Sequence, residues 1–461
     1  MHRLTPAVAP LLAIAGFLFD IAAYYPGQMT FDAAYTWWQA RGGESTDIHS
    51  PTLTQLWRIL ETLWHGPGPV FVLHLLLFWG GLALIALGLR LRPPAAMALM
   101  LLLGLAPILL ILRAHVWTDV GLLGALLVVT GALAFYMRTL HWRWLLLALL
   151  IGFYALGLRH NALPALLPLM VFAVWLSPTA GKTPPTWRRT TLFSILLVAV
   201  MLAGVQAINA RVDRRVPLWP PLAVFDLSAI SIAANQLLLP SYSVGHGMEI
   251  TELAEAFRPW SVNSLLDNTR HGIHEPLAPW TDSELAGLRK AWLGAIVSHP
   301  GEYLRHRLAV TAALFGTQSS DVPSTLTFVD AEIQYRDNPA IAPNTSALHC
   351  VLMQAAQTLR YTPVLAAWPY LLLGVVAAPI AWRRRAQPSA KIALVMLVSA
   401  ALYALPLIVI VPSAERRYLL WSCAAALVAL VLALAREPPR TIARGSGVKS
   451  GGAPMRSRNR E

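Results

Sequence analysis

The sequence predicts an all-α integral membrane protein with about ten transmembrane helices and a large, mostly helical extracytoplasmic segment. Three observations lead to this fold class. The chain is 56% hydrophobic and 13% charged, with a mean hydropathy of +0.55, whereas a soluble domain is about 25% charged. Apolar runs long enough to cross a bilayer recur along the chain, and its Lys and Arg residues are concentrated in the connections on one side.

Apolar runs of roughly 17–25 residues are typical of helices that cross a bilayer. We expect spans at 7–25, 69–89, 94–112, 118–137, 144–158, 161–177, 190–208, 363–382, 391–411 and 418–435. The fifth and sixth runs are short and meet at "LRHN". Together the runs predict a polytopic protein with a long interruption before its last three spans.

The distribution of charge predicts the orientation of the chain. With the N-terminus in the cytoplasm, the inner connections and tails carry 19 of the 36 Lys and Arg residues but 2 of the 23 Asp and Glu residues. This asymmetry follows the positive-inside rule, and both termini are then cytoplasmic. It also accounts for the formal net charge of +13 without a nucleic-acid partner.

The spans divide the chain into four parts. Residues 1–208 form an N-terminal transmembrane module, whose first outer loop is 26–68. Residues 209–361 form an extracytoplasmic helical segment with interfacial helices, and 362–435 form the C-terminal transmembrane helices. The basic tail 436–461 is predicted to be disordered next to anionic lipid.

Two helical stretches stand out in the extracytoplasmic segment. One begins after a cap at Thr281 or Asp282, with Glu284 in its first turn, and is broken or kinked at Pro300. The other covers about 346–361.

The first outer loop contains the first candidate site residues. Asp32 lies just past the first span, where a partly buried carboxylate can act as a general base on a hydroxyl; alternatively, it caps the helix "AAYTWWQA". Asp47 and His49, in "DIHSP", suit metal binding, substrate orientation or a turn before a helix starting near Pro51. The tryptophans of this loop are interpreted as anchors at the membrane interface.

Polar residues also lie at three outer helix ends, where ionisable groups usually face a cavity or a partner. These residues are Asp119, Arg159, Asn161, Glu415, Arg416 and Arg417. The planar guanidinium matches phosphate, so Arg159 and one of Arg416 and Arg417 are candidates to bind a phosphate group. Snorkelling to the interface or an Arg–Asp pair is the alternative.

An ordered series of motifs runs through most of residues 7–436. It comprises "PGQMTFDAAYTWWQA", "DIHSP", "WTDV", "LRHNALPALLP", "FDL", "SHPGEYLRHR" and "AERRYLLW". In this order the motifs resemble those of GT-C-type membrane glycosyltransferases, which take a sugar from a polyprenyl-phosphate carrier. The similarity is to bacterial relatives of the protein mannosyltransferase and aminoarabinose transferase group, whose first loop has an acid followed by D-x-H-P-P; here Ser50 replaces one proline.

The resemblance implies an enzyme that works on the outer face of the bacterial inner membrane. It makes Asp32 the catalytic acidic residue of the first loop. Asp47 and His49 would bind the acceptor or support the site, and the arginines would bind the carrier phosphate. Protein mannosyltransferases have a Glu after this Asp, whereas Ala33 follows here. This difference weakens the case for a protein acceptor, and a glycan, a lipid and a protein all stay open as acceptors. No cofactor beyond the lipid-linked sugar is obligatory; a divalent metal ion remains an alternative without assigned ligands.

Two other functions remain open from the sequence: a transporter or flippase for lipid-linked or envelope components, and a glycan polymerase or ligase. A transporter often has interrupted helices in two related halves, and no such symmetry is visible in this sequence. If the polar residues form one site, Asp32, Asp119, Arg159 and Arg417 must lie close together in the fold.

Overall fold

The computed structural model describes residues 7–177, 186–244, 248–266, 279–317, 327–329 and 333–435. In these ranges the regular structure is entirely helical, and β-type pairing is limited to isolated bridges. The predicted all-α fold class is therefore confirmed. The prediction of a disordered basic tail at 436–461 falls outside the described residues.

Every range predicted as a span contains a helix. The apolar helices are α1 (Val8–Tyr24), α4 (Gly68–Gly88), α5 (Pro93–Leu105), α6 (Pro107–Leu112), α7 (Thr118–Thr139), α8 (Trp142–Leu158), α9 (Leu163–Leu176), α10 (Trp187–Asn209), α17 (Trp368–Arg383), α18 (Pro388–Ile410) and α19 (Leu420–Leu434). Within the described ranges, five helical stretches are long and apolar enough to cross a membrane: α4, α7, α10, α18, and α19 with the turn before it. The chain is a membrane protein.

The range 94–112, predicted as one span, is two helices in the structure. The chain leaves the helical conformation at Ala106, and α6 starts at Pro107. Proline has no backbone N–H to continue a helix, and it disfavours the helical conformation in the residue before it. The break is thus explained by one residue within an otherwise apolar run.

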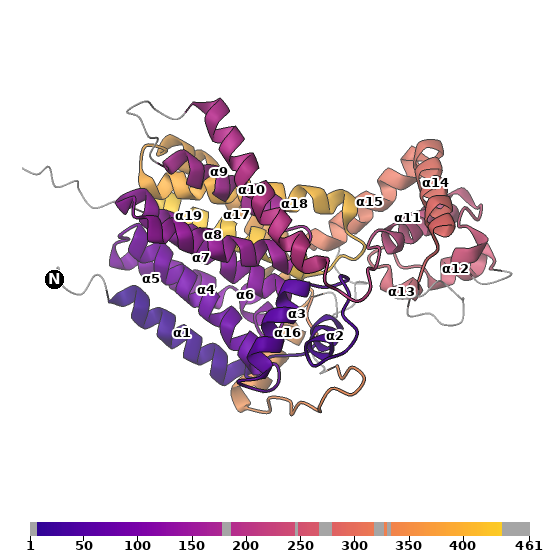
Figure 1. The fold of residues 1–461 in the computed structure, drawn as a ribbon, viewed down its shortest axis with the longest axis horizontal. Helices are drawn as coiled ribbons and strands as arrows, with labels where there is room; N and C mark the ends of the chain where they lie inside the picture. Colours follow the sequence, from indigo (N-terminus) through magenta and orange to yellow (C-terminus); the bar gives the residue numbers. More distant parts are fainter. Residues whose placement is uncertain are drawn as a thin grey trace, which may run out of the picture.

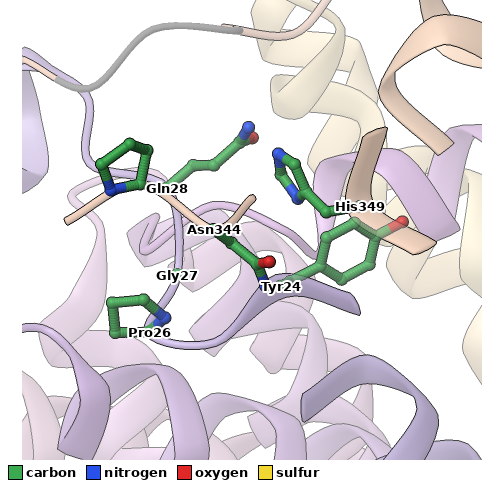
Figure 2. A pocket seen from close by; sticks show the side chains of 7 residues that line it. Tyr24, Pro26, Gly27, Gln28, Asn344 and His349 are labelled. Atoms are coloured by element: carbon green, nitrogen blue, oxygen red, sulfur yellow. The ribbon is translucent and has the colours of Figure 1, made fainter. Parts of the chain in front are cut away.

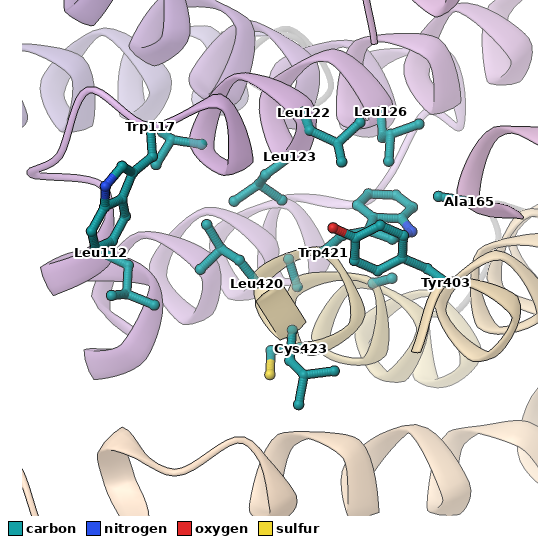
Figure 3. Close-up of a cluster of buried hydrophobic side chains, with 14 of the residues drawn as sticks. Leu112, Trp117, Leu122, Leu123, Leu126, Ala165, Tyr403, Leu420, Trp421 and Cys423 are labelled. Carbon is teal, nitrogen blue, oxygen red and sulfur yellow. The ribbon is translucent and has the colours of Figure 1, made fainter. Parts of the chain in front are cut away.

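The apolar helices lie side by side in a bundle, with α7 and α19 near its centre (Figure 1). The apolar windows of these two helices are mostly buried, whereas that of α10 is mostly exposed on the outside of the bundle. Figure 3 shows a cluster of buried side chains that includes Leu123 of α7 and Leu420 of α19, with Trp117 at one margin. This packed core supports the polar residues at the end of the bundle.

Helices α4 and α7 pack closely because glycines remove side chains from their contact. A Cβ added at Gly81 would lie 2.6 Å from Cβ of Leu127 and 2.8 Å from the backbone nitrogen of Val128. Gly80, the preceding residue on the same helix, would meet nothing within 4 Å. Small residues at helix contacts are what allow such close approach in membranes.

We expect Gly81→Ala to destabilise the protein by about 1–3 kcal/mol, because the new methyl group overlaps the backbone of α7. Gly80→Ala is the matched control and has no such overlap. Thermal unfolding of both variants in detergent measures the difference. Equal unfolding temperatures would contradict the close α4–α7 contact.

The remaining helices lie at one end of the bundle, away from the N-terminus (Figure 1). They are α2 (Phe31–Ala40), α3 (Pro51–Glu61), α11 (Pro220–Ala234), α12 (Ile250–Ala256), α13 (Asn263–Leu266), α14 (Asp282–Ser298), α15 (Pro300–Phe315) and α16 (Ala347–Leu359), with the short 3₁₀ turns η1 (Ser241–Ser243), η4 (Pro363–Leu365) and η5 (Arg416–Leu419). The first loop and the 209–361 segment therefore share one end of the molecule.

The helix signals in this segment are confirmed. Thr281 caps α14 and forms a reciprocal capping box with Glu284, and Pro300 is the first residue of α15 after a break at His299. Ser346 caps α16 by accepting a hydrogen bond from the backbone N–H of His349. Local sequence is sufficient to place these helix starts.

A buried polar cluster fixes these helices to the bundle. Asp226 of α11 accepts a hydrogen bond from Trp292 of α14 at 2.9 Å and forms an ion pair with Arg307 of α15. Arg307 also donates to the carbonyl oxygen of Val411, just after α18, at 2.8 Å. His306 lies 3.3 Å from the same carboxylate. The "FDL" and "SHPGEYLRHR" motifs thus meet, and their polar residues hold the fold together.

Candidate active site

Helix α2 presents Asp32 at the end of the bundle. Thr30 occupies the N-cap position and Asp32 lies in the first turn. The interpretation of Asp32 as a helix cap is therefore wrong; its carboxylate points instead to Arg417, with Oδ2 2.6 Å from Nη1. The Asp32 side chain keeps 35% exposure, so it remains reachable from outside.

The "DIHSP" segment brings His49 to the same place. Ser50 caps α3: its hydroxyl accepts from the N–H of Leu53 at 2.9 Å and donates to the carbonyl oxygen of Gly157 at 2.7 Å. The predicted turn before a helix is confirmed, and Ser50 makes hydrogen bonds that a proline cannot make. This anchoring places Nε2 of His49 3.9 Å from Oδ1 of Asp32.

Asp47 lies apart from this pair. Its carboxylate accepts a hydrogen bond from the backbone N–H of Val216 at 2.7 Å, and its carbonyl oxygen contacts Nε2 of His160 at 3.1 Å. Asp47 therefore connects the first loop to the chain that follows α10. Its side chain supports the loop that carries His49.

Arg417 joins the pair from η5, just before α19. Besides Asp32, its guanidinium forms an ion pair with Glu415 through Nε. The guanidinium also lies over the rings of Trp117 and Tyr418, 4.9 Å and 5.3 Å from their centroids. Two carboxylates and two aromatic faces thus hold this arginine in one orientation.

Arg159 approaches the same tyrosine from the C-terminal end of α8. Its guanidinium lies 4.9 Å from the centroid of Tyr418, forms an ion pair with Asp119 at the start of α7, and donates through Nε to Oδ1 of Asn161 at 3.2 Å. Both guanidiniums therefore face one ring. Asp32, Asp119, Arg159 and Arg417, which come from distant parts of the sequence, meet in one cluster.

Arg416 does not join this cluster, although it is the neighbour of Arg417. It is 5% exposed, and its Nη1 lies 3.5 Å from the carbonyl oxygen of Leu314, near the end of α15. A Cβ on Gly316 would lie 1.9 Å from the same nitrogen. The 3₁₀ turn directs the two adjacent arginines to different neighbours, so only Arg417 is beside Asp32.

The charges around Asp32 and His49 determine which of these two side chains carries a proton at neutral pH. Burial opposes ionisation of Asp32, but Arg417 foremost, with His49 and Arg159, holds its pKa well below the usual range. Burial lowers the pKa of His49, and the neighbouring Asp32 opposes that shift. At neutral pH the site therefore holds an Asp32 carboxylate beside a neutral imidazole.

Aromatic side chains pack beside Asp32, and one of them, Tyr335, was not a candidate from the sequence. Tyr335, between α15 and α16, packs edge-on against Phe31 and Tyr35 at centroid distances of 5.5 Å and 5.1 Å. Tyr35 in turn lies 5.4 Å from the ring of His49. The chain around Tyr335 is held to the first loop by Asn338, which donates to the carbonyl oxygen of Ala34 at 2.8 Å.

Three of the first loop's tryptophans are buried and are not interface anchors, whereas Trp64 is 41% exposed. Trp37, Trp38 and Trp57 are all buried, and Trp37 stacks on Trp57 at 6.5 Å while donating to Glu61. Trp37 and Trp57 pack together between α2 and α3, whereas Trp38 packs edge-on against Tyr335. This interpretation failed because the indole side chain suits a packed core as well as an interface.

A separate small cavity of about 60 Å³ lies at the end of α1 (Figure 2). Tyr24, Gln28 and His349 line it, and the Tyr24 hydroxyl and Gln28 Oε1 are buried without a hydrogen-bond partner. Ligand pockets generally measure about 300–1,000 Å³, so this cavity suits water rather than a sugar. In the described ranges, no three His, Cys, Asp or Glu side chains are grouped to hold a metal ion.

We expect Asp119→Asn to lower the unfolding temperature. Asp119 is 1% exposed and neutralises Arg159, and removing one partner of a buried pair costs about 3–5 kcal/mol. Because the Arg159 side chain is partly exposed, water can solvate its charge in the variant, and the loss of stability is expected to be smaller than this range. The double variant Asp119→Asn/Arg159→Gln should lose less than the sum of the single losses. Strictly additive losses in thermal unfolding would contradict the pairing.

Comparison with known proteins identifies no relative: no family model, no curated protein and no solved structure matches this chain.

Proposed function

We propose that this protein is a membrane glycosyltransferase that transfers a sugar from a polyprenyl-phosphate carrier to an envelope glycan, lipid or protein. The observation that carries the proposal is the cluster of Asp32, His49, Arg159 and Arg417 at one end of the helix bundle. It combines a carboxylate and an imidazole for a hydroxyl group with two guanidiniums for a phosphate group. Both kinds of group are needed for this reaction.

The proposed setting is the outer face of the bacterial inner membrane. Ten spans with both termini in the cytoplasm place the first loop and the 209–361 segment outside, in agreement with the bias of 19 Lys and Arg residues to the inner side. The donor's phosphate then lies near the lipid headgroups, with its sugar directed to the outer end of the bundle. The cluster lies at that end.

In the proposed reaction the acceptor hydroxyl attacks the anomeric carbon of the sugar. The new carbon–oxygen bond forms while the bond from that carbon to the carrier phosphate breaks, and the phosphate leaves with the electron pair. Asp32 binds and orients the hydroxyl, and Arg159 and Arg417 stabilise the charge that develops on the phosphate. A single displacement inverts the anomeric configuration.

Both arginines are paired with carboxylates in this structure, but this does not saturate them. A guanidinium has five donors in a fixed fork. Arg417 uses Nη1 and Nε for Asp32 and Glu415, and Arg159 uses Nη1 and Nε for Asp119 and Asn161. The carboxylates orient the two guanidiniums, and we propose that their remaining donors bind a phosphate group beside Tyr418.

The direct test uses the full-length protein in liposomes. Synthetic polyprenyl-phosphate hexoses and pentoses with a radiolabelled sugar are supplied together with an envelope extract as acceptor. The proposal predicts label on an acceptor and one equivalent of free polyprenyl phosphate per sugar transferred. Exchange of intact donor across the bilayer without phosphate release would instead indicate a transporter or flippase. Transfer of preformed glycan chains, with single sugars left on their carrier, would indicate a polymerase or ligase.

A further inference from the structure

We propose that His49 is the general base of the transfer, taking the proton from an acceptor hydroxyl that is bound between His49 and Asp32. This inference rests on the proposed function and assigns a step within it. It gives the two residues separate roles, with Asp32 orienting the hydroxyl and His49 accepting its proton.

The geometry between the two side chains fits one bridging hydroxyl. Nε2 of His49 lies 3.9 Å from Oδ1 of Asp32, too far for a direct hydrogen bond, and Nε2 is buried without a partner. An oxygen can make hydrogen bonds of about 2.8 Å to both atoms at this separation. Catalytic hydrogen bonds are often longer before the substrate binds. The unpartnered nitrogen of His49 is thus an unused acceptor beside Asp32.

Asp32 is poorly suited to take the proton itself. The Arg417 guanidinium, 2.6 Å from Oδ2, stabilises its carboxylate and holds the pKa of Asp32 well below the usual range. A carboxylate stabilised in this way is a weak base. A general base works best when its pKa lies near the operating pH, and histidine is the side chain nearest to that condition.

The surroundings of His49 fix its position and keep it neutral. The ring packs edge-on against Tyr35 of α2, and Ser50 anchors the next residue to the end of α8. The charged and titratable groups that face it are Asp32 from α2, Arg417 from η5, and Arg159 and His160 from the α8–α9 connection. Burial and the cations lower its pKa, while Asp32 raises it. Nε2 accepts a proton when Nδ1 carries the ring hydrogen.

The step balances without a co-reactant. The hydroxyl proton passes to Nε2 of His49 as the oxygen bonds to the anomeric carbon, and the carrier phosphate leaves with the electron pair of the broken bond. The resulting imidazolium lies beside the Asp32 carboxylate, which stabilises it. Loss of this proton to water after the product leaves returns His49 to its neutral form.

The expected pH dependence follows from these assignments. A rate that depends on neutral His49 is highest above its pKa and falls as the pH drops through that value, which lies below the ordinary 6.5. Asp32 remains ionised there because Arg417 holds its pKa well below the usual range of a carboxyl group. The acidic limb of the profile therefore belongs to His49.

The test compares His49→Gln with His65→Gln in the full-length protein, using the radiolabelled donors in liposomes. His65 is 87% exposed at the end of α3 and provides the same substitution outside the cluster. We expect His49→Gln to lower kcat about 10²- to 10⁴-fold, to leave the donor KM nearly unchanged and to remove the acidic limb. Added imidazole should restore transfer by His49→Ala, which separates a base from a structural role.

An acidic limb that persists in His49→Gln, a wild-type rate in that variant, or no rescue of His49→Ala by imidazole would overturn the assignment while leaving the proposed function intact. Failure of the wild-type protein to transfer any sugar would overturn both. His65→Gln should match the wild type in rate and in pH profile.

Discussion

Asp32→Asn is expected to reduce sugar transfer by at least about 10²-fold while the protein folds and inserts normally. The amide has the size of the carboxylate but no charge, so it neither holds Arg417 nor stabilises the imidazolium of His49. Release of polyprenyl phosphate from radiolabelled donors measures the effect.

The matched control is Asp213→Asn. Asp213 belongs to the same end of the molecule and accepts two hydrogen bonds from Ser45, but it lies outside the cluster. Its variant should keep the wild-type rate, even if its stability falls. Full activity of Asp32→Asn would remove this residue from the mechanism.

The second large effect is expected for Arg417→Lys, which keeps the positive charge. Arg417 contacts Asp32 through Nη1 and Glu415 through Nε, and a lysine has one nitrogen that cannot reproduce this fork. The developing charge on the phosphate also loses a preorganised donor. Losing one such donor costs about 10²- to 10³-fold in kcat.

Arg214→Lys is the control for this change. Arg214 forms a two-point ion pair with Glu44 in an exposed position at the same end of the molecule, and exposed pairs contribute little. If both lysine variants lost the same activity, or neither lost any, a specific role for the Arg417 fork would be contradicted.

Most of the helices were predictable from the sequence because their signals are local, although no ranges were predicted for α11, α12 and α13. Apolar runs mark the bundle helices, a capping box marks the start of α14, and Pro300 marks the start of α15. The break between α5 and α6 was missed because Pro107 stands in an uninterrupted apolar run, where hydropathy outweighs a single residue.

The site was predictable in part. Asp119, Arg159 and Arg417 were candidates because charges at helix ends are costly, and Asp32 because a partly buried carboxylate can act as a general base. The fold brings all four together. The directions of Arg416 and Asp47 depend on contacts with Leu314 and Val216, which are far away in sequence. No local pattern encodes such contacts.

Tyr335 was missed for a related reason. It lies in a connection without periodicity, and its place beside Phe31 follows from hydrogen bonds such as that between Asn338 and Ala34. Tyr418 was visible within "AERRYLLW", but the approach of two guanidiniums to its ring requires η5 and the end of α8 to be adjacent. Aromatic residues gain their role here from tertiary packing.

The measurement that tests the central claim most directly is a structure of the full-length protein with a non-transferable polyprenyl-phosphate sugar analogue. The proposed mechanism predicts the phosphate beside Tyr418, in hydrogen-bond contact with Arg159 and Arg417, and the anomeric carbon facing Asp32 and His49. A phosphate bound elsewhere, for example at Arg416, with the Asp32 cluster unchanged, would contradict it.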